Sequence, residues 1–230
     1  MHNWPGLPPG QIAVRAGPIL AATDEIRIDV RGKGGHAAMP DLSVDPVVMA
    51  AHIITALQTI ASRNVNPLDA VVVSVCSMET SQLGTFNVIP DAVKLIGTVR
   101  TFRAGTQTLA EQRIRDIAAA VAQGLGGSAE VEYIRGYPAT VNTAREADFA
   151  ARVGERIFGE ANVVREFDAT MGGEDFAYML QARPGAYVLL GQGGGPSGCY
   201  LHNPNYDFND DVIPLGAGFL AALAEDALPL

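Results

Sequence analysis

Histidine is the side chain in this sequence best suited to chemistry, and it occurs at four of 230 positions. Imidazole is the commonest transition-metal ligand and the usual acid or base near neutral pH. His2 and His202 share a local pattern, because each precedes an asparagine and a nearby proline in MHNWP and LHNPNYD. Proline restricts the residue before it to extended backbone, so both histidines lie in rigid, non-helical segments. Each ring could ligate a metal or lie idle in a loop.

The other two histidines have different surroundings. His36 lies in the glycine-rich run GKGGHAAMP, where the absence of side chains lets a ligand approach the backbone closely. A plain turn histidine is the alternative reading there. His52 lies within an apolar helical stretch, which is typical of an ordinary half-buried structural position.

Polar residues in three further motifs could bind a substrate or simply face solvent. Asn87 lies in FNVIP, and Arg100 lies in GTVRTF on the polar face of an expected strand. An arginine there can grip a carboxylate through two parallel hydrogen bonds, although a solvated charge is the simpler explanation. Glu174 and Asp175, in MGGEDF, are explained by the preference for negative charge in the first turn of a helix. The loop GQGGGPSG lacks the Lys-Ser or Lys-Thr pair of a P-loop.

Composition excludes several classes of protein. The net charge of −9 gives no basic face for nucleic acid, and 48% apolar with 18% charged residues is typical of a globular protein. No run of about 18 apolar residues predicts a membrane span, and no secretory signal is visible. We expect a cytoplasmic protein in which Cys76 and Cys199 are buried or semi-buried thiols.

The elements between residues 22 and 137 should form one compact unit. Alternating apolar residues predict strands, and apolar residues at helical spacing after the N-cap Asp45 predict a helix. The expected order is strand 25–31, helix 47–61, strand 69–77, strand 92–102, helix 107–124 and strand 129–135. This β-α-β-β-α-β order is that of a ferredoxin-like sheet with two helices on one face.

After Pro138 the pattern changes to that of an α/β layer. We expect a helix over 144–158, a short strand over 163–167, a helix from about Gly173, a strand over 186–191 and a helix over 214–227. Two strands make an incomplete sheet. The first 18 residues belong to neither unit in this reading.

Five motifs together resemble a known family. They are HNWPGLPPG, GKGGHAAMP, FNVIPDAVKLIGTVRTF, MGGEDFAYML and LHNPNYDFNDD, in this order and at fitting distances. The set resembles the M20 metallopeptidases, and among them the amidohydrolases that include hippurate hydrolase and the plant auxin-conjugate hydrolases. The resemblance implies an α/β fold in which a ferredoxin-like lid, which mediates dimerisation, is inserted into a catalytic domain. Residues 1–20 and 138–230 would then be catalytic-domain pieces, and 21–137 the lid.

The resemblance also implies roles for single residues. His2 and His202 match metal ligands of a site that holds two divalent ions, for which zinc, manganese, nickel and cobalt are all compatible. His36 matches a lid histidine that polarises the scissile carbonyl, often in the neighbouring subunit's site. Asn87 and Arg100 match lid residues that hold the substrate carboxylate or the oxyanion. The implied partners are an N-acyl amino acid and a second copy of the chain.

One departure from the family pattern divides the functional hypotheses. Relatives carry a CGHDGH-like motif and a paired-glutamate motif upstream of HNWP, and these supply the other ligands and the general base. Neither motif occurs in these 230 residues. The first hypothesis is a metal-dependent amidohydrolase of N-acyl amino acids. The second is a catalytically inactive dimerisation or binding fragment of such an enzyme, and a third is an α/β domain with an unrelated binding role.

Overall fold

The computed structural model describes residues 1–82, 84–194 and 198–228, so residues 195–197 of the GQGGGPSG loop lie outside it. The chain folds into two compact units. The first, here the split unit, comprises Met1–Leu20, Thr140–Thr170 and Glu174–Leu230. The second, here the inserted unit, comprises Ala21–Ala139 and Met171–Gly173. No helix in the described ranges is both long and apolar enough to cross a bilayer.

The inserted unit is built on a four-stranded antiparallel sheet with two helices. The strand order is β6-β8-β4-β9, the order of a ferredoxin-like unit. The elements are β4 (Ala22–Arg31), α1 (Pro46–Leu57), β6 (Val71–Thr80), β8 (Ala92–Thr101), α2 (Ala104–Gly124) and β9 (Ser128–Arg135). The expected α/β class is confirmed, and the elements of this unit follow the expected order.

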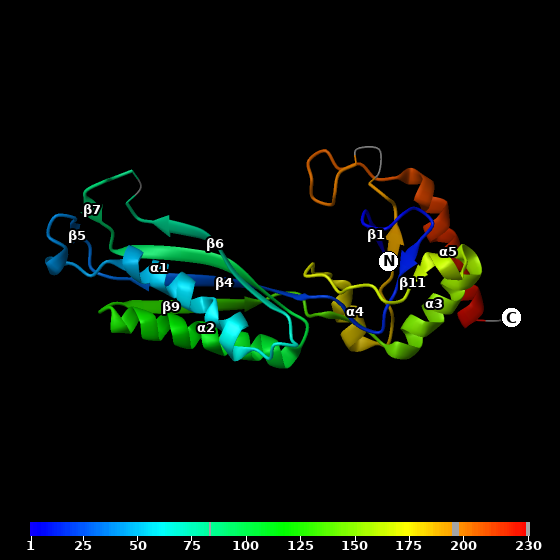
Figure 1. Cartoon of the computed structure of the whole chain (residues 1–230), viewed down its shortest axis with the longest axis horizontal. Coiled ribbons are helices and arrows are strands. Elements are labelled where there is room, and N and C mark those ends of the chain that lie inside the picture. The colour runs from blue at the N-terminus through cyan, green and yellow to red at the C-terminus, as the bar shows by residue number, and fades with distance from the viewer. Residues whose placement is uncertain (83, 195–197, 229–230) are drawn as a thin grey trace. The chain divides into compact units, whose positions relative to one another are not determined.

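Alternation of apolar and polar residues gives the central sheet one covered and one open face. Ile26, Ile28 and Val30 of β4 are buried, and the residues between them are only partly buried. Figure 1 shows α1 and α2 running side by side along one face of the sheet. The helix α1 begins at Pro46 because the Asp45 side chain accepts a hydrogen bond of 2.8 Å from the Val47 amide. The opposite face of the sheet therefore carries the polar side chains.

Four short elements complete the inserted unit. Strand β5 (Gly35–His36) pairs with β7 (Val88–Ile89) in a two-stranded ribbon. The predicted helix over 47–61 ends at Leu57 and is followed by a π-helical turn over Ile60–Asn64. A 3-10 turn covers Pro40–Leu42.

Cys76 is exposed, so the prediction of a buried or semi-buried thiol there is wrong. The register of β6 against β8 shifts between Val75 and Ser77, and Cys76 is the extra residue of the bulge. A bulge in an edge strand turns its side chain away from the core pattern. Gly97 lies opposite, where an added Cβ would come within 2.2 Å of the Ser74 carbonyl oxygen. Cys199 is half-buried, and no disulfide joins the two cysteines in the described ranges.

The split unit contains a four-stranded sheet of order β1-β12-β2-β11. Its strands are β1 (His2–Trp4), β2 (Ile12–Ala13), β11 (Val163–Val164) and β12 (Leu189–Gly191). The sequence predicted two strands here. The other two come from the amino-terminal segment, where two or three residues are too few to show a periodic pattern.

Helices and a second strand pair surround that sheet. They are β3 (Gly17–Leu20) with β10 (Thr140–Asn142), α3 (Ala144–Phe158), α4 (Phe176–Ala182) and α5 (Ile213–Ala227), with 3-10 turns at Glu160–Asn162 and Asp210–Val212. The core between α3, α5 and the sheet includes Ile12, Val153, Leu190 and Phe219, all buried. Because β1 pairs with β12 of this packed sheet, His2 is positioned next to the core.

Candidate functional site

His2 lies on β1, which pairs in parallel with β12 so that the His2 amide donates to the Val188 carbonyl at 3.0 Å. Its ring Nδ1 lies 2.6 Å from the Asn3 carbonyl oxygen. A carbonyl oxygen only accepts, so Nδ1 carries the proton and Nε2 of the neutral ring keeps a free lone pair. A metal-binding histidine is typically held in this way, with its other ring N–H given to a carbonyl.

His202 lies in a turn and has a φ of +63°, the only non-glycine residue in the described ranges with positive φ. An L-residue in the left-handed region is strained and keeps this conformation only where the surrounding structure holds it there. Such strain occurs most often at functional sites. The backbone of this turn therefore supports a role for the His202 side chain that the sequence alone could not distinguish from an idle loop residue.

The segments that carry His2 and His202 lie side by side in the split unit. The Trp4 ring is 6.4 Å from the His2 ring and 6.0 Å from the Tyr200 ring, centroid to centroid. The Asn3 side-chain amide also donates to the Tyr206 hydroxyl. The amino-terminal strand and the loop around residue 202, two hundred positions apart in sequence, are thus tied together.

A complete metal site is not formed by these residues. Across residues 1–82, 84–194 and 198–228, no three His, Cys, Asp or Glu side chains come together as a metal-binding group. Metal sites in proteins use three or four protein ligands, and two imidazoles are not enough for a tight one. The donor set in the described ranges therefore does not fit a metal ion by itself.

Glu174 lies near His2, which the sequence did not indicate. The helix α4 begins at Phe176, whose backbone amide interacts with both carboxylates, in line with the expected preference for negative charge at a helix start. The buried Tyr187 hydroxyl also donates to the Glu174 carboxylate. Burial opposes ionisation, but hydrogen bonds from Tyr187 and Asp175 lower the pKa of Glu174 overall. The GGED sequence gives no sign of this arrangement.

His36 and Asn87 are brought together at one end of the inserted unit. His36 pairs with Val88 across the β5–β7 ribbon, and the Ala37 amide donates to the Asn87 carbonyl at 3.0 Å. The His36 Nδ1 accepts a hydrogen bond of 3.1 Å from the Ala38 amide. The proton of the neutral ring is therefore on Nε2, and this exposed N–H can donate to a substrate oxygen.

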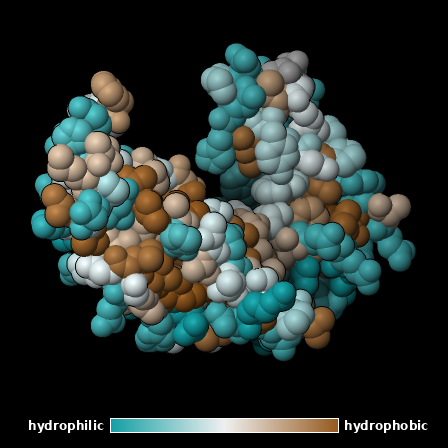
Figure 2. All heavy atoms as spheres, turned by 60° about the vertical axis from the view of Figure 1, so that its left-hand side comes forward, coloured by the Kyte–Doolittle hydropathy of each residue, from teal (hydrophilic) through white to brown (hydrophobic). Residues whose placement is uncertain are grey.

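Exposed apolar side chains lie at the same end of the inserted unit as His36. Figure 2 shows apolar side chains exposed among hydrophilic ones over one face of the chain. Cross-strand partners in an antiparallel pair share a face, so the Val88 side chain, 41% exposed, lies beside the His36 imidazole. The same end of the unit exposes further large apolar side chains: Met39, Leu42 and Phe86.

Arg100 lies on the open face of the sheet, at the position of β8 just before its last residue, Thr101. Thr23 of β4 and Val72 of β6 are its cross-strand neighbours. Within the described part of the chain its guanidinium has no ion-pair partner, and it lines a cavity of about 380 Å³. This setting suits the binding of an anion.

The structure separates Arg100 from His36 and Asn87. The β5–β7 ribbon lies beyond the Ala92 end of β8, since the Gly32 amide donates to the Asp91 carbonyl. Arg100 is eight residues further along the same strand, a distance of about 26 Å. One small substrate cannot touch both groups within a single copy of this unit.

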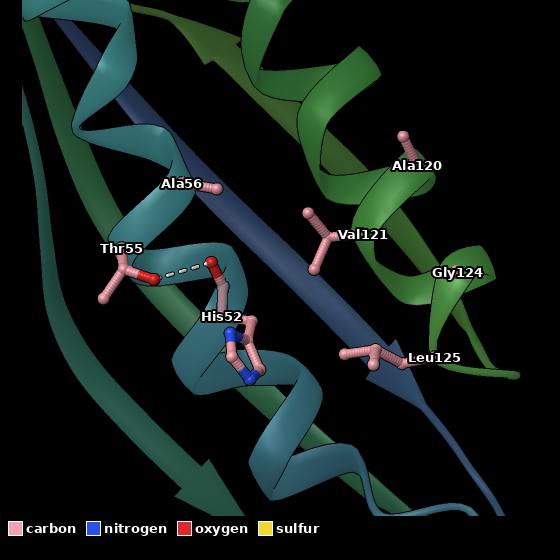
Figure 3. A pocket seen from close by; sticks show the side chains of 7 residues that line it. All are labelled: His52, Thr55, Ala56, Ala120, Val121, Gly124 and Leu125. Carbon is pink, nitrogen blue, oxygen red and sulfur yellow. Dashed lines mark hydrogen bonds between the residues drawn. The ribbon is translucent and has the colours of Figure 1, made fainter.

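His52 has surroundings that differ from those of the other histidines. It is exposed rather than half-buried, and it lines a groove of about 520 Å³ between α1 and α2. Figure 3 shows His52 and Thr55 on the α1 side, with Val121 and Leu125 on the α2 side. The remaining lining residues are not titratable, so the groove offers no catalytic pair.

Comparison with known proteins places these residues in context. The family model described as peptidase family M20/M25/M40 matches residues 1–226. N-acetylcysteine deacetylase of Bacillus subtilis is 36% identical over 225 residues, which are 97% of this chain and 57% of that protein. Hippurate hydrolase of Campylobacter jejuni is 33% identical, with 97% of this chain and 57% of that protein covered.

Solved structures give the same picture. The crystal structure of a Bacillus subtilis protein, described as a dinuclear metal-binding peptidase of family M20, matches with a TM-score of 0.80 and 28% identity. The match covers 99% of this chain and 56% of that one. The chain therefore spans little more than half the length of the relatives that it resembles.

Proposed function

This chain belongs to peptidase family M20/M25/M40, and we propose that it acts in an amidohydrolase that cleaves the amide bond of N-acyl amino acids. Its relatives include enzymes named for N-acetylcysteine and for hippurate, which are both N-acyl amino acids. The shared chemistry is an acyl group, an amide bond and a free carboxylate. The proposed enzyme would recognise each of these three parts.

The opposite protonation of two imidazoles is the observation that carries the proposal. His2 donates from Nδ1 and leaves Nε2 as a lone pair for a cation. His36 accepts at Nδ1 and leaves Nε2–H as a donor for the scissile carbonyl oxygen. A donor aimed at the oxygen where negative charge develops stabilises the transition state of amide hydrolysis. The apolar side chains beside His36 would contact the acyl group.

Arg100 is the residue that we assign to the substrate carboxylate. Its planar guanidinium is unpaired within the described ranges and can donate two parallel hydrogen bonds. Asn87, which lies with His36, is assigned to the oxyanion rather than to the carboxylate, because it is at the far end of β8 from Arg100.

A homodimer accounts for the separation of these two groups. We propose that His36 and Asn87 of one copy and Arg100 of another serve the same substrate. The edge strand β6 is ten residues long and is paired on one side only within the inserted unit. Such an edge is a natural surface for a second copy.

Divalent metal is the cofactor that we propose, in line with the relative described as a dinuclear metal-binding peptidase. His2 and His202 are the imidazoles that this chain would contribute. A bound divalent ion supplies Lewis acidity and lowers the pKa of water. Because the described residues do not complete a site, further ligands are required.

A second candidate is a module that dimerises and binds N-acyl amino acids without hydrolysing them. The absence of a three-residue ligand group in the described ranges favours it. In this case Arg100 and His36 would keep their binding roles, and no water would be activated.

An assay of hydrolysis with and without added metal distinguishes the two candidate functions. The full chain would be incubated with hippurate or N-acetylcysteine, with and without added zinc or manganese, and free glycine or cysteine would be quantified. The amidohydrolase proposal expects release that a chelator abolishes. Binding of either compound without release would instead support the non-hydrolysing module.

A further inference from the structure

A three-residue segment from the later part of the chain is built into the inserted unit. Met171–Gly173 belongs to that unit, although Thr170 and Glu174 on either side of it belong to the split unit. The Ala21 amide donates to the Gly172 carbonyl at 2.8 Å, which fastens the segment to the start of the inserted unit. The two units are thus covalently joined through this segment, in addition to the joins at the two ends of the main inserted segment.

Close packing makes glycine necessary at position 173. A Cβ added to Gly173 would lie 2.1 Å from the Thr23 Cγ2 atom and 3.3 Å from the Thr23 Cβ and Oγ1 atoms. Non-bonded carbon atoms pack at about 3.5–4.0 Å, so Gly173 or Thr23 would have to move. Gly173 does not have a positive φ. The lack of space, rather than the backbone conformation, therefore excludes a side chain there.

Thr23 has little freedom to move away from such a side chain. Its amide donates to the Tyr137 carbonyl at 2.9 Å, and it pairs with Arg100 within the sheet. The neighbouring chain at Gly136 is equally close, since a Cβ there would lie 2.2 Å from the Thr23 carbonyl oxygen. A side chain at position 173 should therefore displace the segment that carries it rather than the strand that carries Thr23.

The residue after this glycine is Glu174, whose carboxylate is held within the split unit. It accepts a hydrogen bond from the Tyr187 hydroxyl. The Tyr187 backbone is fixed in turn by the Asn142 side chain, which accepts from the Tyr187 amide at 2.6 Å and donates to its carbonyl at 3.0 Å. His2 lies next to this pair, because its amide donates at 3.0 Å to the carbonyl of Val188, the residue after Tyr187.

From these contacts we propose that Gly173 is a positioning residue for the site around His2. Its close approach to Thr23 sets the backbone of Glu174 and thereby the place of the carboxylate beside the His2 ring. A change in the inserted unit at Thr23 would reach His2 through packed and covalently joined groups. The inference deepens the proposed function, in which His2 is a metal ligand, but its test needs neither metal nor turnover.

Nuclear magnetic resonance of the histidine rings tests this link at His2 itself. The chain has four histidines, so the ring Cε1–H signal of His2 can be identified by its loss in His2→Gln. Gly173→Ala should shift that signal by more than its linewidth and leave the signal of His52, on α1, unchanged. Gly105→Ala is the matched control and should shift neither signal, since a Cβ at Gly105 would meet no atom within 4 Å.

A compensating substitution distinguishes the close contact from general damage to the fold. Thr23→Ser removes Cγ2, the atom nearest to the added Cβ. Because substitutions at two residues in contact are not additive, Thr23→Ser combined with Gly173→Ala should return the His2 signal toward its wild-type position. A His2 signal that stays in place in Gly173→Ala, or that moves equally with and without Thr23→Ser, would overturn the proposal.

Glu174→Gln gives a second test that leaves the packing of Gly173 intact. It should also shift the His2 signal, and an unmoved signal would overturn the proposal even where Gly173→Ala does not fold. Far-ultraviolet circular dichroism would verify the fold of each variant. Because these readouts do not depend on hydrolysis, a wild-type chain without amidohydrolase activity would contradict the proposed function and leave the positioning role in place.

Discussion

At the scale of single residues, the position of one proton decides what His36 can do. Its Nδ1 is occupied by the Ala38 amide, so only Nε2–H can reach a substrate. This arrangement needs the short β5–β7 ribbon, which fixes the backbone on both sides of the ring. The glycine-rich sequence around His36 indicated a close approach to a ligand but could not give the tautomer.

Replacement of His36 tests this donor. We expect His36→Ala to lower kcat/KM for hippurate by about 10²- to 10³-fold, the usual effect of removing one oxyanion donor. His36→Gln keeps an N–H and should retain more activity than the alanine variant. His52→Ala is the control, because this exposed histidine lies in the groove between α1 and α2. Equal losses in the His36 and His52 variants would contradict the assignment.

The strained backbone of His202 gives a prediction about stability. Glycine adopts a φ of +63° without strain, so His202→Gly should raise the free energy of unfolding by about 1 kcal/mol relative to His202→Ala. Both variants lose the imidazole, so both should take up less divalent metal than wild type. Urea unfolding without metal measures the first effect. If the glycine variant is no more stable than the alanine variant, the turn is not strained in solution.

At the scale of helices and strands, the long elements could be predicted and the short ones could not. The ten residues of β4 and of β8 show clear alternation, and Asp45 marks the start of α1. In contrast, β1 and β2 have three and two residues, and they are strands only through their pairing, β1 with β12 and β2 with both β12 and β11. The bulge at Cys76 was also invisible, because it depends on the register between two strands.

The contact between α2 and β9 depends on the Glu111 carboxylate. Its contribution to the free energy of unfolding should therefore change with pH. Burial opposes ionisation of Glu111, but hydrogen bonds from Arg135 and Arg115, with salt bridges of 2.8 and 3.1 Å, lower its pKa below the usual 4.5. A carboxyl with a lowered pKa in the folded state stabilises the protein above the unfolded-state value. That stabilisation is lost as the pH falls through the folded-state pKa.

Glu111→Gln should therefore reduce the free energy of unfolding near pH 7 by about 1 kcal/mol or less, the range for partly exposed pairs. The difference from wild type should shrink below about pH 4. Glu130→Gln is the matched control, since Glu130 forms no ion pair within the described ranges and should show no such trend. A Glu111 effect of the same size at pH 3 and pH 7 would exclude the ion pairs as its cause.

At the scale of the whole molecule, the candidate residues lie in separate places. The sequence alone could not predict which of them lie close together. The motifs predicted that His2 and His202 lie near each other, and the Trp4–Tyr200 contact ties their segments together. The motifs also grouped Asn87 with Arg100, but a β-strand of ten residues holds them far apart. Separation along the sequence does not give the distance in space. FNVIP and GTVRTF are close in sequence, but the extended strand β8 runs between them.

In the proposed homodimer, residues of two copies of the chain meet at one site, and mixed dimers can test this proposal. His36→Ala retains Arg100, and Arg100→Ala retains His36. A dimer with one copy of each variant has one site with both intact residues and one site with neither. Random mixing makes half of the dimers mixed, so about a quarter of the wild-type sites should be restored.

The decisive measurement is therefore the rate of glycine release from hippurate by the two variants, each alone and after co-refolding at equal amounts with divalent metal present. The account predicts that each variant alone is nearly inactive and that the mixture recovers about a quarter of the wild-type rate. A mixture no more active than the mean of its two components, beside an active wild type, would contradict the shared site.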